Sequence, residues 1–315
     1  MISIALATYN GSAFIKDQIE SIFSQTWNDF EIIACDDCST DNTLKILREY
    51  ALKDYRLKVY QNKTNLGFKK NFEHILSLCS GEYIACCDQD DIWEKDHLEI
   101  LFNNIGTNDC IGANATIIDK YGNFMNLTTK DMLSVDSSII TPNSIFRHEC
   151  FYNIIQGTAC LFRKELLTKI LPFPDGIQFH DHWIALNASV QNGCMYIPDI
   201  VLQYRNHEKN ITGYKKFNIF HALKTIFQAR SIRKQIYSAN LAMLMAIKQN
   251  NLPVENIFHI DNAINFFKNL SNGKKRFSII SYYIKNYNDI TLCPKKKWKL
   301  FLYRLFCLIA FGLML

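Results

Sequence analysis

Three carboxylates follow an apolar run in the first third of the chain. Asp88, Asp90 and Asp91 come directly after Tyr83–Cys87. Like charges this close together repel and raise one another's pKa unless a cation lies between them. Carboxylate oxygens are hard ligands that suit Mg²⁺ or Mn²⁺, and a site with few protein ligands leaves positions open for phosphate oxygens. The pattern therefore predicts a divalent metal site, and the alternative is a solvated turn that caps a helix near Trp93.

Apolar runs alternate with amphipathic segments over the first hundred residues. The runs expected to form strands are Ile2–Ala7, Phe30–Cys35, Leu57–Gln61 and Tyr83–Cys87. The segments with helical spacing of apolar residues are Phe14–Ser24, the stretch around Leu44–Leu47, and Asn71–Leu78. Strands that alternate with helices about every 25 residues predict an α/β fold with a doubly wound, largely parallel sheet.

A polar cluster follows each of these four strands. The clusters are Thr8-Tyr9-Asn10, Asp36-Asp37, the segment from Asn62 to Gly67, and the segment from Asp88 to Asp91. In open α/β sheets, ligands bind outside the carboxyl ends of the strands. We therefore expect the four clusters to form one site, and the acidic pair on the same edge favours the metal over the solvated turn.

The remainder of the chain is less regular. Strands are expected at Cys110–Ile118 and Thr158–Phe162, and residues 215–292 have a helical period and are rich in Asn and Lys. The last segments are the basic Lys295–Lys299 and the apolar Leu300–Leu315, in which Arg304 carries the only charge.

Composition and charge restrict the class of protein. With 48% hydrophobic and 21% charged residues, the chain can bury a core, which excludes general disorder. Residues 1–210 carry 18 Lys and Arg against 27 Asp and Glu, whereas residues 211–315 carry 17 against 3. The acidic part suits a metal and the basic part suits a polyanion, either nucleic acid or an anionic lipid surface.

The C-terminal segment favours the lipid surface. The apolar stretch Leu300–Leu315 has sixteen residues, fewer than the roughly 20 that span a bilayer. A polybasic patch next to an apolar segment is instead typical of peripheral attachment by two signals. The alternative is a C-terminal helix buried in a soluble protein.

The cysteines and the N-terminus indicate a reduced, cytosolic compartment. Eleven cysteines lack the spacing of a disulfide scaffold, and Cys86 and Cys87 are adjacent in an apolar run. The C-x-x-C formed by Cys35 and Cys38 encloses two aspartates, so we interpret it as a coincidence and not as a redox motif. The N-terminus lacks a positively charged region and is expected to be a first strand, not a signal peptide.

Several motifs, in order, resemble those of the family 2 inverting glycosyltransferases. They are Ala7-Thr8-Tyr9-Asn10-Gly11, Cys35-Asp36-Asp37-Cys38-Ser39-Thr40-Asp41, Asn65-Leu66-Gly67, Cys87-Asp88-Gln89-Asp90-Asp91-Ile92-Trp93, Gln156-Gly157, Phe179-His180-Asp181-His182-Trp183 and Tyr204-Arg205-Asn206-His207. The segment from Gln89 to Trp93 and the later His-Asp-x-Trp are most similar to a bacterial rhamnosyltransferase-like branch. Cys38 departs from the family, which often has a small residue such as Gly there.

The resemblance implies the GT-A nucleotide-sugar-binding fold and a domain organisation. A GT-A domain is expected at 1–212, with a donor half at about 1–105 and an acceptor half at about 106–212. A helical, basic extension would follow at 213–294, and a polybasic-apolar, membrane-associating tail at 295–315.

The resemblance also implies roles for individual residues on the donor side. Tyr9 would lie against the nucleobase, and Asp37 would accept a hydrogen bond from the imide N–H of the base. Asp88 and Asp90 match the D-x-D that bridges ribose, metal and diphosphate, with Asp90 as the direct ligand of Mg²⁺ or Mn²⁺, and His207 would complete this site. The expected donor-binding residues are Thr8, Tyr9, Asn10, Asp37, Asn65 and Asp88. Lys69 and Asn71 are further candidates, which loop and helix-cap roles explain equally well.

Asp181 is the expected catalytic base. Inverting transfer is a single displacement, so one base must take the proton of the acceptor hydroxyl. Asp181 could also cap the following helix, and the two roles are compatible. The residues expected on the acceptor side are Gln156, Gly157, His180, His182 and Trp183. We favour acceptor or second-layer contacts for the two histidines over metal ligation.

The sequence thus predicts a metal-dependent, inverting glycosyltransferase at the cytoplasmic membrane face. It would use a UDP- or dTDP-linked sugar and extend a lipid-linked glycan in polysaccharide or lipopolysaccharide assembly. One alternative is a nucleotidyltransferase, which would not need Asp181 and its flanking aromatics. Another is an inactive relative that serves as a membrane-bound scaffold, which predicts losses at the metal or base positions. Nucleic-acid binding is disfavoured because no recognised motif accompanies the basic region.

Overall fold

The computed structural model describes residues 1–132, 140–141, 144–208, 210, 235–250, 252–272, 276–287 and 290. The chain forms two compact units. The first unit comprises Met1–Leu133, Ile155–Phe173 and Phe179–Gly213, and the second comprises Ser134–Ile154, Pro174–Gln178 and Tyr214–Leu315. The second unit thus takes in two segments of the half predicted to bind the acceptor.

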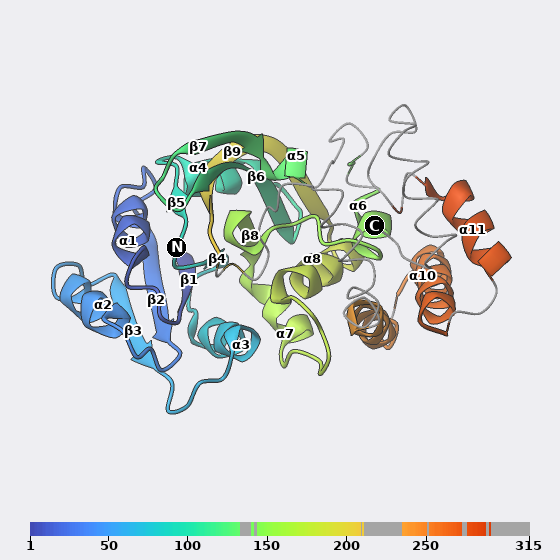
Figure 1. Cartoon of the computed structure of the whole chain (residues 1–315), viewed down its shortest axis with the longest axis horizontal. Helices are drawn as coiled ribbons and strands as arrows, with labels where there is room; N and C mark the ends of the chain where they lie inside the picture. The colour runs from blue at the N-terminus through green and yellow to red at the C-terminus, as the bar shows by residue number, and fades with distance from the viewer. Residues whose placement is uncertain are drawn as a thin grey trace. The chain divides into compact units, whose positions relative to one another are not determined.

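The first half of the first unit is a parallel α/β arrangement (Figure 1). Its elements are β1 (Ile2–Thr8), α1 (Ile15–Phe23), β2 (Phe30–Asp36), α2 (Thr43–Ala51), β3 (Leu57–Gln61), α3 (Phe68–Leu78) and β4 (Tyr83–Cys87). The strands lie in the order β3-β2-β1-β4 and every neighbouring pair is parallel. The α/β fold with parallel strands alternating with helices is therefore confirmed.

The second half of the first unit extends the same sheet in the order β8-β6-β9-β5, with β7 paired to β6. Its elements are β5 (Ile92–Trp93), α4 (His97–Asn104), β6 (Cys110–Asp119), β7 (Phe124–Thr128), α5 (Thr129–Met132), η1 (Gly157–Ala159), β8 (Cys160–Arg163), η2 (Lys164–Leu166), α7 (Leu167–Ile170), α8 (His180–Val190) and β9 (Cys194–Asn206). Strand β8 is antiparallel to β4 and β6, while β6 and β9 are parallel. The strand predicted at Thr158–Phe162 begins only at Cys160, because Gly157–Ala159 form a 3₁₀ turn.

The sequence did not indicate strand β9. In its pairing with β6, Gly112 is opposite Tyr196 and Asn114 is opposite Ile200, so β9 has extra residues between these pairs. This bulge contains Pro198, which has no N–H to donate to the ladder. The interruption hides the strand pattern, although β9 is the strand that brings Tyr204, Arg205 and His207 to the site.

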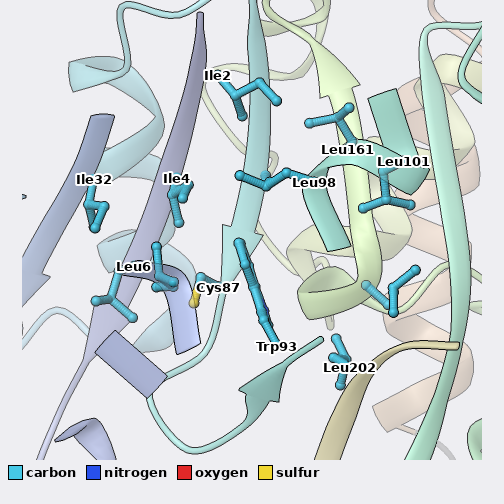
Figure 2. Close-up of a cluster of buried hydrophobic side chains, with 14 of the residues drawn as sticks. Ile2, Ile4, Leu6, Ile32, Cys87, Trp93, Leu98, Leu101, Leu161 and Leu202 are labelled. Atoms are coloured by element: carbon cyan, nitrogen blue, oxygen red, sulfur yellow. The ribbon is translucent and has the colours of Figure 1, made fainter. Parts of the chain in front are cut away.

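Strand β1 is central and buried on both faces. Its side chains Ile2, Ile4 and Leu6 belong to a cluster that also includes residues of α1, α2 and α4. Figure 2 shows how this cluster continues through Trp93, which lies among Cys87 and Leu202. Helix α3 packs against β1 and β2, and its buried residues lie outside this cluster, so α3 covers the other face. Near-continuous apolar strands covered on both faces are typical of parallel sheets.

The described part of the second unit is helical. It contains α6 (Ile145–Glu149), a helix over 235–247, α10 (Val254–Asn272) and α11 (Arg276–Lys285). Its core is aromatic, with the Phe151 ring 5.7 Å from that of Phe266. The predicted tail at 295–315 lies outside the described residues. Over the ranges that the structure does describe, no helix is long and apolar enough to cross a bilayer.

Candidate active site

A cavity of about 380 Å³ opens at the carboxyl ends of β1, β2, β3 and β4. Each of the four polar clusters predicted from the sequence contributes to its wall. The lining residues are Ala7, Thr8, Tyr9, Asp37, Asn65, Gly67, Phe68, Asn71, Phe72, Asp88, Gln89, Asp90, Tyr204 and Asn210. Four of these lining residues were not predicted as site residues. They are Phe68 and Phe72 of α3, Tyr204 of β9 and Asn210, which follows β9.

Asp37 is held in a fixed orientation at one end of this cavity. It is 2% exposed. Its Oδ1 accepts hydrogen bonds from Asn62 Nδ2 and from the Leu66 backbone N–H, both at 2.8 Å. Its Oδ2 accepts one from the Gly67 backbone N–H at 2.8 Å. Gly67 adopts a φ of +77°, which favours glycine, and this turn aims two consecutive N–H groups at the carboxylate. The second lone pair of Oδ2 can accept from a ligand.

Asn62 holds the Asp37 carboxylate in place and was not assigned a role from the sequence. Its Nδ2 also donates to Asn71 Oδ1 at 2.9 Å. Its Oδ1 lies 2.9 Å from His74 Nδ1 and accepts from the Cys35 thiol. Because both N–H groups of the amide are used toward oxygens, Oδ1 must face His74, whose Nδ1 is then the donor. We refer to Asp37, Asn62, Asn65, Gly67 and Asn71 together as the amide end.

The two cysteines of the C-x-x-C are free thiols that contact the amide end. Burial, reinforced by the charges of Asp37 and Asp36, raises the pKa of the Cys35 thiol to about 12, so it is not a reactive thiolate. The Cys38 thiol donates to the Asn62 carbonyl. Cys38 has a φ of +63°, the left-handed region where glycine is preferred.

The remaining predicted donor-side residues divide into two groups. Thr8 and Tyr9 line the cavity, as does Asn65, whose Nδ2 donates to the Asp37 carbonyl at 3.1 Å. Asn10 is not among the described lining residues. Its Oδ1 instead accepts from the Thr40 backbone N–H at 2.8 Å, which holds the loop after β2.

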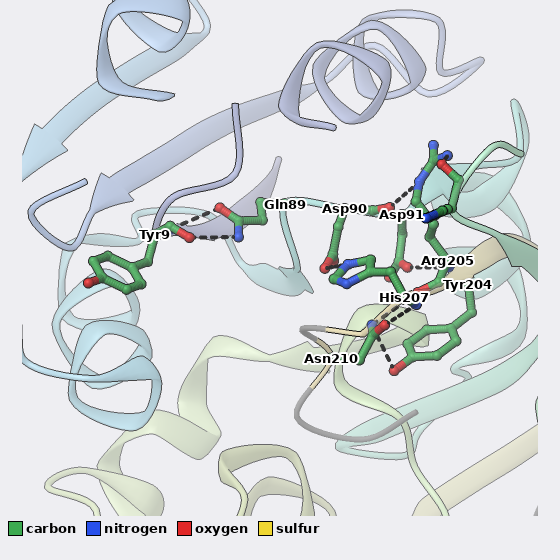
Figure 3. A network of polar contacts seen from close by, with 9 residues as sticks. Tyr9, Gln89, Asp90, Asp91, Tyr204, Arg205, His207 and Asn210 are labelled. Atoms are coloured by element: carbon green, nitrogen blue, oxygen red, sulfur yellow. Dashed lines mark hydrogen bonds and ion pairs between the residues drawn. The ribbon is translucent and has the colours of Figure 1, made fainter. Parts of the chain in front are cut away.

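The opposite end of the cavity is acidic. Burial raises the pKa of the Asp88 carboxyl to about 8, and the charges of Asp90 and Asp181 add to this shift. Asp90 Oδ2 lies 2.8 Å from His207 Nε2 (Figure 3). The His207 ring stacks on Phe14 with a centroid distance of 4.9 Å. We refer to Asp88, Asp90 and His207 as the acidic end.

Asp91 differs from its two acidic neighbours because it supports the loop. It is fully buried, and its Oδ1 accepts from the Arg205 backbone N–H at 3.0 Å. Burial raises the pKa of Asp91 well above its ordinary range. The Arg205 side chain donates to the Asp90 carbonyl at 2.8 Å and pairs with Asp17 at 2.9 Å. Strand β9 thus holds the acidic loop in place.

The acidic end fits a divalent cation that keeps several open positions. Among the residues that the structure describes, no three His, Cys, Asp or Glu side chains converge to hold a metal by themselves. Mg²⁺ is commonly bound by one or two carboxylates together with phosphate oxygens and water. The raised pKa of Asp88 reports repulsion and burial that a cation between Asp88 and Asp90 would offset.

Asp181 is the second residue of α8 and lies in its first turn, whereas the N-cap position is Phe179 and has no side-chain capping bond. Its Oδ2 accepts from the Gly157 backbone N–H at 2.9 Å, and its Oδ1 accepts from the His182 backbone N–H at 2.8 Å. A Cβ on Gly157 would approach the Asp181 Cβ and His180 Nε2 to 3.2 Å, so the glycine allows this close approach. Asp181 is near enough to Asp88 for its charge to affect the pKa of Asp88.

The predicted acceptor-side residues lie around Asp181 and do not appear among the described residues that line the cavity. The His180 ring stacks on the lining residue Phe72 at 3.8 Å, and burial lowers its pKa. Trp183 is buried and donates from Nε1 to the Ile170 carbonyl at 3.0 Å. His182 is also buried, and Gln156 directly precedes the 3₁₀ turn η1.

The part of the chain that forms this cavity is similar to known proteins. Residues 3–171 match the model of glycosyl transferase family 2. The chain is 28% identical to an uncharacterized glycosyltransferase of Haemophilus influenzae, over 92% of this chain and 98% of that protein. It is 31% identical to the dTDP-rhamnosyl transferase RfbG of Shigella flexneri, over 66% of this chain and 73% of that protein.

Two solved structures share the fold. Residues 1–349 of S. aureus TarS in complex with UDP-GlcNAc give a TM-score of 0.61 at 18% identity, over 99% of this chain and 86% of that one. The mannosyltransferase PcManGT from Pyrobaculum calidifontis, in complex with GDP-Man and Mn²⁺, gives 0.55 at 14% identity, over 99% and 87%. These similarities confirm the GT-A fold predicted from the motifs.

Proposed function

The chain belongs to glycosyl transferase family 2, and we propose that it transfers a sugar from a UDP- or dTDP-linked donor to a glycan hydroxyl with inversion. One observation carries this proposal. A single cavity has a preoriented carboxylate at its amide end and a repelling carboxylate pair at its acidic end. A nucleoside diphosphate needs these two features, one for its base and one for its phosphates.

The amide end would bind the nucleobase. Uracil and thymine both carry an imide N–H that can donate a hydrogen bond to Asp37 Oδ2, whereas cytosine lacks this group. Tyr9 lines the same cavity and would stack on the base. Thr8 and Asn65 would complete the donor contacts, and Asn10 would act through the loop that it holds. The name of the relative RfbG, a dTDP-rhamnosyl transferase, supports a thymidine donor in particular.

The acidic end would hold the diphosphate with Mg²⁺ or Mn²⁺. Asp90 and Asp88 would be the carboxylate ligands, and His207 would give up its contact with Asp90 or join the ligands. When bound, the cation neutralises the charge that develops on the departing nucleoside diphosphate. The Mn²⁺ named with PcManGT supports this choice of metal.

Asp181 would be the catalytic base. As the acceptor oxygen forms its bond to the anomeric carbon, Asp181 takes the hydroxyl proton, and the bond to the diphosphate oxygen breaks on the opposite face. The two backbone N–H groups that bind its carboxylate keep it oriented. Gln156, Gly157, His180, His182 and Trp183 would shape the acceptor side around it.

The acceptor would be a lipid-linked glycan in polysaccharide or lipopolysaccharide assembly, reached at the cytoplasmic membrane face. The excess of 17 basic over 3 acidic residues in 211–315 supports attachment to an anionic surface. In this organisation residues 1–212 catalyse, 213–294 form a basic extension and 295–315 attach to the membrane.

Slow hydrolysis of the donor tests this function without knowledge of the acceptor. The protein is incubated with UDP- and dTDP-sugars and Mn²⁺, and proton NMR follows the first sugar anomer released. We expect release of a nucleoside diphosphate from one donor and a sugar with the anomeric configuration opposite to the donor. Release of the same configuration would contradict inversion. Pyrophosphate formation from a nucleoside triphosphate and a sugar phosphate would indicate a nucleotidyltransferase, and no turnover or binding would favour a scaffold.

A further inference from the structure

The side chain of Gln89 links the loop that carries Asp88 and Asp90 to the backbone of Tyr9. Gln89 Oε1 accepts from the Tyr9 backbone N–H at 2.9 Å, and Gln89 Nε2 donates to the Tyr9 carbonyl at 2.9 Å. The amide therefore pairs with Tyr9 as a neighbouring strand would, across 80 residues of sequence. Figure 3 shows this pair beside Asp90 and His207, with the Tyr9 ring extending away from Gln89.

The chain leaves room for this pair by having glycine at position 11. A Cβ on Gly11 would lie 2.1 Å from Gln89 Oε1 and 2.3 Å from Gln89 Cδ. Gly11 does not adopt a positive φ, so the backbone conformation itself does not require glycine here. The close approach of the Gln89 amide is the feature that excludes a side chain.

Tyr9 needs such support because it is exposed. Its side chain is 47% exposed, and it follows the last residue of β1, where the sheet no longer holds the backbone. The next residue, Asn10, has a φ of +49°, so the chain turns at once. Both backbone polar groups of Tyr9 are bonded to the Gln89 side chain, and Gln89 stands between Asp88 and Asp90 in the sequence.

We propose that Gln89 is a positioning residue that sets the Tyr9 ring for the nucleobase and couples it to the acidic loop. The inference rests on the proposed function, because it assigns Tyr9 to the base and Asp88 and Asp90 to the diphosphate. It predicts that a change at Gln89 weakens binding of a nucleoside that carries no phosphate and so never touches the acidic end. A side chain that only fills space would not have this effect.

Two variants remove the pair from opposite sides. Gln89→Glu keeps the size of the side chain but replaces the Nε2–H₂ donor with an oxygen that faces the Tyr9 carbonyl. Gly11→Ala displaces the Gln89 amide without any change of charge. The displaced atom is the end of a flexible side chain, so we expect both variants to fold. Gln203→Ala is the matched control, since the Gln203 amide bonds to Glu94 at 3.0 Å, and Gln203 is not one of the described lining residues.

The probes are uridine and thymidine without metal. Their binding is measured by saturation-transfer NMR, and the melting temperature of each variant is measured in parallel. We expect Gln89→Glu and Gly11→Ala each to weaken nucleoside binding about tenfold. Gly11→Ala loses both hydrogen bonds to Tyr9, and Gln89→Glu loses one and places an oxygen against the Tyr9 carbonyl. Gln203→Ala should bind like the wild type. In a Gln89→Ala background, Gly11→Ala should add no further loss, because no amide remains to be displaced.

Wild-type affinity in both single variants would overturn the inference, as would losses that add fully in the Gly11→Ala/Gln89→Ala double variant. A fall in melting temperature with unchanged nucleoside affinity would mean that Gln89 only stabilises the loop. Failure of the proposed function gives a different result. In that case the wild-type protein binds neither nucleoside nor UDP and TDP with Mn²⁺, and the positioning role falls with it.

Discussion

The amide end and the acidic end of the cavity satisfy their carboxylates in opposite ways. Asp37 accepts three N–H groups from Asn62, Leu66 and Gly67 and is held before any ligand arrives. At the acidic end, burial and neighbouring charges raise the pKa of Asp88 to about 8, and Asp90 is closed onto His207. In the proposed function, the fold would therefore complete the base site, and the phosphate site would depend on a cation.

Glu31 is a useful reference near the amino end of β2, whereas the site lies at the carboxyl ends of the strands. It accepts from Ser3 Oγ, from the Ser80 backbone N–H and hydroxyl, and from Lys58 Nζ. Burial alone would raise its pKa, but the hydrogen bonds, first of all that from Lys58, lower it to about 2. A buried carboxylate in this fold can thus be fully stabilised by the chain itself, so the opposite state of Asp88 is a property of the site.

The largest effect is expected from Asp181→Asn. Loss of the base should lower the transfer rate by about 10²- to 10⁴-fold. Affinity for the nucleoside diphosphate should be kept or improved, because the Asp181 charge helps to raise the pKa of Asp88. Steady-state kinetics and calorimetry measure the two quantities. Asp175→Asn, at an exposed carboxylate, is the control, and unchanged turnover in Asp181→Asn would exclude Asp181 as the base.

Asp90→Ala should affect only the acidic end. We expect UDP or TDP affinity in Mn²⁺ to fall about tenfold to 100-fold, the loss of a charge-assisted contact. Uridine and thymidine should bind as they do to the wild type. Asp199→Ala removes an exposed carboxylate of β9 as the control. Equal losses for nucleoside and nucleoside diphosphate would show that the two ends are not separate.

Asn62→Ala should affect only the amide end, by about threefold to tenfold in nucleoside affinity, because Asp37 loses one of its three donors. The variant also leaves Asn71 Oδ1 and His74 Nδ1 without their bonds to Asn62. Binding is therefore measured well below the melting temperature, with the exposed Asn104→Ala as the control. A change in the Mn²⁺ dependence of UDP binding without a change in nucleoside affinity would contradict this role.

The smallest effect on ligands is expected from Glu31→Gln, which should leave nucleotide affinity unchanged at pH 7. Its effect is on stability. The folded pKa of Glu31 lies below the ordinary 4.5, so its contribution is present above pH 4.5 and is lost as the pH falls toward 2. The difference corresponds to roughly 3 kcal/mol of unfolding free energy.

Urea unfolding between pH 3 and pH 7 measures this contribution. The wild type should lose more stability than Glu31→Gln on acidification, and the exposed Glu165→Gln should follow the wild type. Parallel curves for Glu31→Gln and the wild type would contradict the assignment.

The sequence was sufficient for the features that depend on pattern. Strands β1 to β4 are apolar runs with polar residues at their ends, so their bounds could be predicted to within one residue, as could the meeting of their carboxyl ends. Strand β9 could not, because Pro198 and a bulge interrupt its pattern. Asp91 stands next to Asp90 in the sequence, but it is fully buried and its carboxylate accepts from the Arg205 backbone N–H.

The sequence pattern could not identify the positioning residues, for a different reason. Gln89 and Asn62 act through bonds to Tyr9 and Asp37, and such bonds depend on the direction of each side chain in the folded protein. A position within a motif does not give that direction. Residue type and spacing can therefore indicate candidates at the cavity, whereas the residues that hold those candidates in place need the structure.

The most direct test of the difference between the two ends is a calorimetric titration of the wild-type protein at pH 7. Uridine, thymidine, UDP and TDP are each titrated with and without Mn²⁺. We predict that one nucleoside binds equally well in both conditions and that its diphosphate gains at least about tenfold in affinity with Mn²⁺. A nucleoside that binds only with Mn²⁺, or a diphosphate that binds as tightly without it, would contradict a preformed base site next to a cation-dependent phosphate site.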